Sequence, residues 1–149
     1  MRKVWRLAAV CISVLMLGGC GGQEETVKLT TDTSGVKVEM QLEAKGDTIH
    51  TMTQTSTVEV GELTDEQKTL VEDEIKKAEA NFADIKGAEY TYEFGDTELK
   101  ETITIDMTDS DSLDQLSSKN LLPIEGSTSK ISLKATKTNL EEQGWTVVE

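Results

Sequence analysis

The fold of this chain is decided by residues 36–60, which read VKVEMQLEAKGDTIHTMTQTSTVEV. Apolar side chains recur at every second position from Val36 to Leu42, the period of a strand with one buried face. Lys45-Gly46-Asp47 predicts a turn, and the Thr-rich stretch after it predicts a second strand, because β-branched threonine suits a half-exposed strand. We expect the two faces of this second strand to differ, with Thr51, Thr53, Thr55 and Thr57 on one and His50, Met52, Val58 and Val60 on the other.

The segments on either side extend the sheet. Val27 and Leu29 alternate before a turn-rich tetrad at 32–35, which predicts a hairpin with the strand that starts at Val36. Residues 88–94 and 99–107 alternate around a Gly95-Asp96 turn and predict a second hairpin. The sequence therefore predicts an antiparallel sheet of about five or six strands.

One long helix and one or two shorter helices are expected to cover this sheet. Thr64-Asp65-Glu66-Gln67 fits a capping box, in which the first and fourth residues each bond the other's backbone N–H. Helical spacing follows it, and Gly87 is the expected stop; the apolar stripe is Leu70, Val71, Ile75, Ala78 and Phe82. Strands followed by a helix, then strands and helix again, indicate an α+β fold in a single domain over residues 26–149.

The last third of the chain leaves one choice open. Residues 109–119 predict a short helix, and 120–129, with the single Pro123, predict a loop. Residues 132–143 fit a helix that ends at Gly144, followed by an extended segment over 145–148. The competing interpretation makes Ile131, Leu133 and Ala135 one face of a strand, and the helix is preferred.

The amino terminus has the pattern of an export signal. Three basic residues in 1–6 precede an apolar run of eleven residues, Leu7 to Leu17, which is shorter than the roughly 20 needed to span a bilayer. Leu17-Gly18-Gly19-Cys20 resembles the lipobox of bacterial lipoproteins. We therefore predict a signal peptide over 1–19, lipidation of Cys20, and a flexible polar tether over 20–25. An ordinary secretory signal with an incidental Cys20 is the competing interpretation.

Lipidation would place the domain on the extracytoplasmic face of the cell membrane. Each methylene group of an acyl chain that is buried in the bilayer contributes about 0.8 kcal/mol to membrane binding, and two chains give stable anchoring. The membrane, reached through the N-terminal lipid anchor, is therefore the first predicted partner.

Charge and cysteine content exclude several classes of function. The formal charge is −13, and removal of the three basic residues of 1–19 leaves 12 Lys and Arg against 28 Asp and Glu, or −16. Such a surface repels nucleic acid and keeps copies apart, so we expect no nucleic-acid partner and a monomer. Cys11 lies in the signal and Cys20 at its end. The mature domain then has no thiol for a disulfide, a nucleophile or a thiolate metal site.

The residues that could carry chemistry have plainer interpretations. His50 is the only histidine, so it builds neither a two-His metal site nor a triad and is best interpreted as an ordinary strand histidine. Asp109, Asp111 and Asp114 lack the glycine and the final acid of a calcium loop, and acids favour a helix start. Asp106 is expected on the outer face or at a turn, as a strand end or cap. We predict no catalytic residue, no cofactor and no metal site.

The aromatic residues near the second hairpin could line a pocket or fill the core. Alternating strand positions more often face the core, and that interpretation is preferred for the group, which comprises Tyr90, Tyr92, Phe94 and Trp145.

Several of these segments resemble the YehR-like lipoproteins, a family of short bacterial proteins with a domain of unknown function. The resemblance covers nearly the whole chain, through the lipobox, Gly46-Asp47, and the segments 85–89, 104–107 and 140–145. It implies an α+β lipoprotein without an assigned activity.

Two functions from different classes remain. The first is a non-enzymatic envelope module that binds a partner protein, a wall component or a small ligand through the sheet face or the Thr-rich strand. The alternative is a metal- or substrate-handling accessory, hydrolase-like, that acts through surface carboxylates. The first is preferred because the mature chain offers no recognisable set of nucleophile and base.

Overall fold

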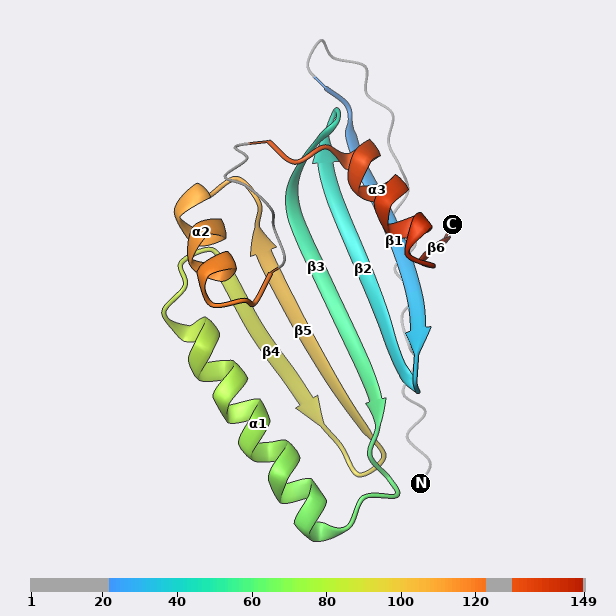
Figure 1. Ribbon diagram of the computed structural model, residues 1–149, viewed down its shortest axis with the longest axis vertical. Coiled ribbons are helices and arrows are strands. Elements are labelled where there is room, and N and C mark those ends of the chain that lie inside the picture. Colours follow the sequence, from blue (N-terminus) through green and yellow to red (C-terminus); the bar gives the residue numbers. More distant parts are fainter. Residues whose placement is uncertain (1–21, 123–129, 149) are drawn as a thin grey trace, which may run out of the picture.

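The computed structural model describes residues 22–122 and 130–148 and shows a six-stranded antiparallel sheet with helices on one face (Figure 1). The strands run β1 (Glu24–Thr33), β2 (Val36–Lys45), β3 (Thr48–Glu59), β4 (Ala88–Phe94), β5 (Glu98–Asp106) and β6 (Thr146–Val148). The helices are α1 (Asp65–Ala83), α2 (Ser110–Ser118) and α3 (Leu133–Glu142). The predicted α+β class is confirmed, as are the strand number and the one long and two shorter helices.

The strands lie in the order β4-β5-β3-β2-β1-β6. β1, β2 and β3 form a meander, and its first turn is built by Ser34 and Gly35, whose φ angles of 56° and 82° suit a two-residue hairpin turn. The β4–β5 hairpin pairs through β5 with the other edge of β3, and the short β6 pairs with β1. Both hairpins predicted from the sequence are present.

The capping box at the start of α1 is also confirmed. The Gln67 amide donates to Thr64 Oγ1 at 3.3 Å, and the Thr64 amide donates to Gln67 Oε1 at 2.9 Å. The helix buries Ile75 and Phe82, as expected, but Leu70 is 65% exposed. The prediction for Leu70 was wrong because the neighbouring Val71 takes the inward position, and one residue on a helix is rotated by about 100° from the next.

The two shorter helices are held by side-chain caps. Asp109 accepts from the amides of Asp111 and Ser112, which confirms the acidic helix start expected there. Ser132 caps α3, so the helical interpretation of 132–143 is confirmed. The competing strand is reduced to one isolated bridge between Ser132 and Thr48. Residues 123–129, within the predicted loop, lie outside the described part of the chain.

Asp47, in the β2–β3 turn, ties α3 to the sheet. Its carboxylate accepts from the Lys134 amide at 2.8 Å and from Ser132 Oγ at 2.7 Å. These two bonds favour the ionised form and lower the pKa of Asp47. The turn and the helix start therefore form one hydrogen-bonded unit.

The core fills the space between the helices and one face of the sheet. Its larger part joins strand residues such as Leu29, Leu42 and Ile105 to Leu116 of α2 and Leu133 of α3. A smaller part packs Ile75 of α1 against Val60 and Leu99. Because side chains alternate along a strand, the opposite face of the sheet faces away from all three helices. We call this opposite face the open face.

The start of β1 differs from the prediction. β1 begins at Glu24, and the Gly46 amide donates to the Gln23 carbonyl at 2.8 Å. The expectation of a flexible tether through residue 25 is therefore wrong for Glu24 and Glu25, which pair with Lys45 and Ala44 of β2. Among the described residues, no helix is both long and apolar enough to cross a bilayer.

Candidate functional site

The open face is a regular array of polar side chains. Cross-strand register aligns one row across all six strands: Thr146, Thr30, Glu39, Thr55, Thr102 and Thr91. The adjacent row is Val148, Lys28, Gln41, Thr53, Thr104 and Glu89. The threonines of the neighbouring strands β3 and β5 in these rows are half-buried, and Thr55 and Thr102 place their hydroxyls 3.4 Å apart. The predicted threonine face of β3 is confirmed as part of this array.

A bulge brings His50 onto the same face. Glu43 of β2 pairs with Thr51 of β3, whereas Ala44 pairs with Ile49, so His50 is the extra residue. Ile49 and Met52 both remain buried in the core as a result. The prediction that His50 shares a face with Met52 was wrong, because a one-residue bulge shifts the alternation of side chains.

The ring of His50 is held from two sides. Nδ1 lies 3.0 Å from Thr51 Oγ1, and Nε2 lies 3.0 Å from the Oε2 atom of Glu24. Glu24 belongs to β1, and β2 lies between it and β3. The pair therefore reaches over the end of β2 and fixes the orientation of the imidazole.

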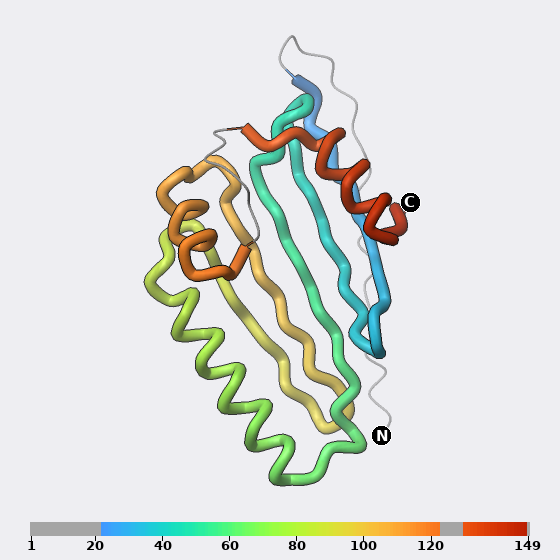
Figure 2. Tube along the Cα trace, viewed as in Figure 1, coloured from blue at the N-terminus to red at the C-terminus, as the bar shows by residue number. Residues whose placement is uncertain are grey.

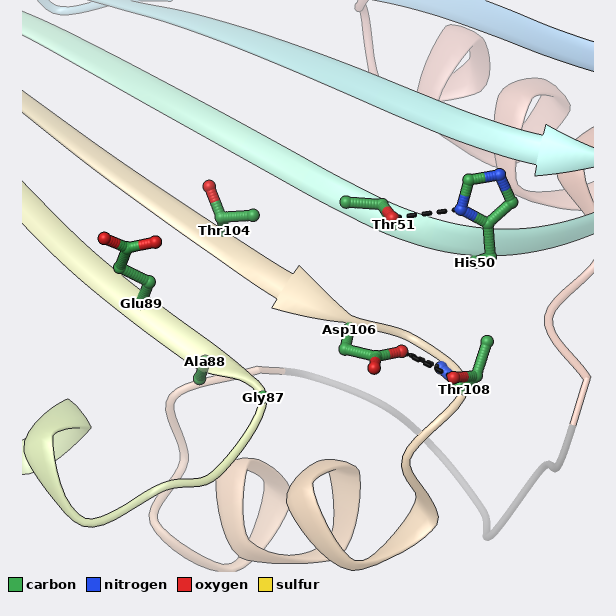
Figure 3. A pocket seen from close by; sticks show the side chains of 8 residues that line it. All are labelled: His50, Thr51, Gly87, Ala88, Glu89, Thr104, Asp106 and Thr108. Carbon is green, nitrogen blue, oxygen red and sulfur yellow. Dashed lines mark hydrogen bonds between the residues drawn. The ribbon is translucent and has the colours of Figure 1, made fainter.

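Beside His50 lies an open hollow of about 600 Å³, which we call the rim hollow (Figure 3). It forms where β3 and β4 begin and β5 ends, and it is lined by His50, Thr51, Gly87, Ala88, Glu89, Thr104, Asp106 and Thr108. The volume falls in the range of small-molecule sites, roughly 300–1,000 Å³. Its walls offer two carboxylates, an imidazole and threonine hydroxyls, a set that binds polar ligands by hydrogen bonds and charge.

Asp106 is the most firmly placed carboxylate of the rim hollow. Its Oδ1 atom accepts from the Thr108 hydroxyl at 2.6 Å and from the Thr108 amide at 2.9 Å. These bonds lower the pKa of Asp106 and keep it ionised at neutral pH. The prediction of a strand-end cap is confirmed. The other carboxylate oxygen of Asp106, Oδ2, takes no part in these two bonds.

A second, smaller hollow of about 290 Å³ lies across β1 and β2, and we call it the central hollow. Its polar side chains come from the two threonine rows and include Lys28, Gln41, Thr53 and Thr55. Gln41 donates to Glu43 at 2.7 Å, which orients its amide along the face. Thr53 pairs directly with Thr104 of the rim hollow, so the two hollows belong to one continuous surface.

The aromatic residues lie mostly on the helix side. Tyr90 stacks on Phe82 with ring centroids 5.7 Å apart, and its hydroxyl donates to Glu101. Burial, followed by the bond to Glu101, raises the pKa of Tyr90. Phe94 and Trp145 also pack against the core, as preferred, but the prediction was wrong for Tyr92, which is 42% exposed. Ligand stacking on aromatic rings is therefore not what the open face offers.

The three aspartates that the sequence offered as calcium ligands belong to a helix start. Asp109, Asp111 and Asp114 lie in the first half of α2 or at its cap. Within residues 22–122 and 130–148, no group of three or more His, Cys, Asp or Glu side chains could hold a metal ion. Cys20, the predicted lipidation site, lies outside the described residues.

Comparison with known proteins adds a family. The model of a family described as "protein of unknown function (DUF1307)" matches residues 25–146. The chain belongs to this family. It is 30% identical to the uncharacterised lipoprotein Lmo0207 of Listeria monocytogenes, over 97% of this chain and 95% of that protein. It is 25% identical to the uncharacterised lipoprotein YehR of Escherichia coli, over 70% of this chain and 69% of that protein.

Two solved structures share the fold of this DUF1307 chain. The NMR structure of E. coli YehR has a TM-score of 0.65 at 22% identity and covers 85% of this chain and 92% of that chain. The NMR structure of a protein from Streptococcus pneumoniae has a TM-score of 0.62 at 14% identity, covering 99% and 98%. At these identities the likeness concerns the fold alone. The predicted resemblance to YehR-like lipoproteins is confirmed.

The sequence predicted the threonine face of β3 but not the rim hollow. Asp106 and Glu89 come together with His50 through the pairing of β4, β5 and β3, which a single sequence does not specify. The one local signal was Gly87, just before β4, because a glycine there predicts a turn at the start of that strand. The Asp106 amide donates to the Gly87 carbonyl at 2.7 Å.

Proposed function

We propose that this protein is a lipoprotein, acylated on Cys20 after removal of residues 1–19, and that it binds a polar ligand at the outer surface of the cell membrane through its open face. The observation that carries the binding role is that three helices cover one face of a six-stranded sheet while the other face presents two hollows in continuous polar rows. Two relatives named as lipoproteins support the anchor.

The chemistry of the open face favours binding over catalysis. Its rigid strands hold hydroxyl, amide and carboxylate groups at fixed spacing. A ligand with several polar groups can therefore bind without the loss of conformational entropy that ordering a flexible backbone would require. The one imidazole has both ring nitrogens engaged, Nδ1 with the Thr51 hydroxyl and Nε2 with the Glu24 carboxylate, so neither nitrogen is free to take a proton from a ligand. The ligand is therefore expected to leave unchanged.

The anchor is tested by Cys20→Ala. Because two acyl chains give stable membrane attachment, the variant is expected to leave the membrane fraction or to accumulate as uncleaved precursor. Mass spectrometry of the mature N-terminus and membrane fractionation make the measurement. Normal processing and membrane retention of Cys20→Ala would show that the anchor lies elsewhere.

The binding role is tested by photo-crosslinking in intact cells. A benzoylphenylalanine in place of Thr91, an exposed residue of the open face beside the rim hollow, is expected to give a discrete adduct that mass spectrometry identifies. The same residue in place of Glu72, exposed on α1, serves as the matched control on the covered side. An adduct from the Glu72 position with none from Thr91 would assign binding to the helices instead.

A further inference from the structure

The chain joins the folded sheet almost at once after the predicted anchor. Gln23 accepts the Gly46 amide at 2.8 Å, and Gly22 lies so close to Gly46 that an added Cβ would come 2.7 Å from the Gly46 nitrogen. Only Gly21 lies between Gly22 and Cys20, and the two Cα-to-Cα steps from Gly22 to Cys20 reach at most about 7 Å. An acylated Cys20 would therefore hold the surface around Gly22 within a few ångströms of the lipid headgroups.

This surface is one end of the sheet, which we call the anchor end. It contains the β2–β3 turn, the segment before α3 and the first turn of α3, which lie together in Figure 2. The Ile49 amide donates to the Ile131 carbonyl, and the Leu133 amide donates to the Asp47 carbonyl, both at 2.9 Å. These bonds make the anchor end a rigid platform.

The charges of the anchor end and of the open face differ. Lys45, Lys130 and Lys134 are exposed at the anchor end, against Glu24, Glu25 and Asp47, so the charges there balance. Strands β1–β5 place three lysines and nine acids on the open face: Lys28, Lys37 and Lys100, with Glu24, Asp32, Glu39, Glu43, Glu59, Glu89, Glu93, Glu98 and Asp106. Anionic lipid headgroups therefore repel the anchor end less strongly than they repel the open face as a whole.

We propose that the domain stands on the lipid bilayer with its anchor end against the headgroups, so that the strands run away from the membrane and the open face is held upright. This inference rests on the acylation of Cys20 proposed above. β1 has ten residues and spans about 30 Å, so the β1–β2 turn lies about that far from the bilayer. The rim hollow, beside Glu24, lies at the membrane surface and would receive ligands presented there.

Site-specific quenching tests this orientation in the lipidated full-length mature protein. The predicted mature chain has no cysteine besides the acylated Cys20, so one introduced cysteine gives one label. Lys45 and Thr33 are exposed and lie at opposite ends of the β1–β2 hairpin. The variants Lys45→Cys and Thr33→Cys therefore place one label at each end. With a fluorophore at each, in anionic vesicles that carry a headgroup nitroxide, we expect quenching several-fold stronger at 45 than at 33.

A longer tether supplies the matched control. A Gly-Ser linker of about twelve residues after Gly21 spans roughly 20 Å on average and is expected to reduce the difference between the two labels while the protein stays on the vesicles. An unchanged difference would overturn the short tether as its cause. Equal quenching at 45 and 33 in acylated, vesicle-bound protein would overturn the upright orientation alone. A protein that lacks acyl chains and stays off the vesicles would overturn the proposed anchor.

Discussion

Gly87 is the single residue on which the rim of the open face most depends. It joins the end of α1 to β4 with a φ of +84°, and an added Cβ would lie 3.2 Å from Ser112 Oγ and 3.4 Å from the Cβ atom of Asp106. Gly35 has nearly the same φ, +82°, but open space around it. A substitution at Gly35 therefore adds backbone strain alone, whereas one at Gly87 adds both backbone strain and steric crowding.

We expect Gly35→Ala to lower the free energy of unfolding by about 1–2 kcal/mol, the cost of a left-handed conformation for an L-residue. Gly87→Ala carries this cost and must also displace Ser112 or Asp106, so its loss is expected to exceed that of Gly35→Ala by about 1 kcal/mol or more. Urea denaturation measures both. Equal losses would show that α2 shifts freely and that the rim hollow is not rigidly framed.

At the same scale, capping residues could be predicted and His50 could not. Asp106, Asp109 and Thr64 act within a few residues of their own position, so the local sequence carries the signal. The position of His50 depends on a bulge between β2 and β3, which is an event in the pairing of two strands. Alternation alone assigns it to the wrong face.

Among the elements, α2 is the one whose burial depends on two leucines. Leu116 is 0% exposed and Leu113 is 7% exposed, on a helix of nine residues. Such a short helix is not stable alone, so its packing on the sheet must hold it. The i,i+3 spacing of the two leucines predicted this helix. In the longer α1, by contrast, periodicity placed Leu70 on the buried face although it is exposed, so the edge of an apolar stripe can be wrong by one position.

Leu116→Ala is expected to lower the free energy of unfolding by about 2–5 kcal/mol, because it removes a fully buried side chain and leaves a cavity. Leu70→Ala makes the same chemical change at a helix position that is 65% exposed, and is expected to stay within about 0.5 kcal/mol of the wild type. Thermal and urea unfolding provide the comparison. A large effect of Leu70→Ala in lipidated protein but not in its soluble form would mean that α1 is covered by a partner.

For the whole molecule, the sequence predicted the class of fold and the polar character of one sheet face, because both follow from alternation within single strands. The order of the strands in the sheet could not be predicted from this alternation. β5 pairs with β3 across an intervening helix and strand, and only that pairing places Asp106 beside Thr51. The order of the strands thus determines where the candidate site lies, while the residue types of the strands determine its chemistry.

Net charge is the last feature of the whole molecule with a measurable consequence. The predicted mature chain has 28 acids against 12 basic residues, and two of its surface ion pairs, Lys37–Glu39 and Lys77–Glu74, join residues that are both largely exposed. Exposed pairs contribute little, so repulsion among the acids should dominate the effect of salt. Raising NaCl at pH 7 is expected to raise the melting temperature by about 4 °C. Near pH 4.5, the isoelectric point of the full sequence, the carboxylates are partly protonated and the same salt should have little effect. Destabilisation by salt at pH 7 would mean instead that ion pairs across the open face outweigh the repulsion.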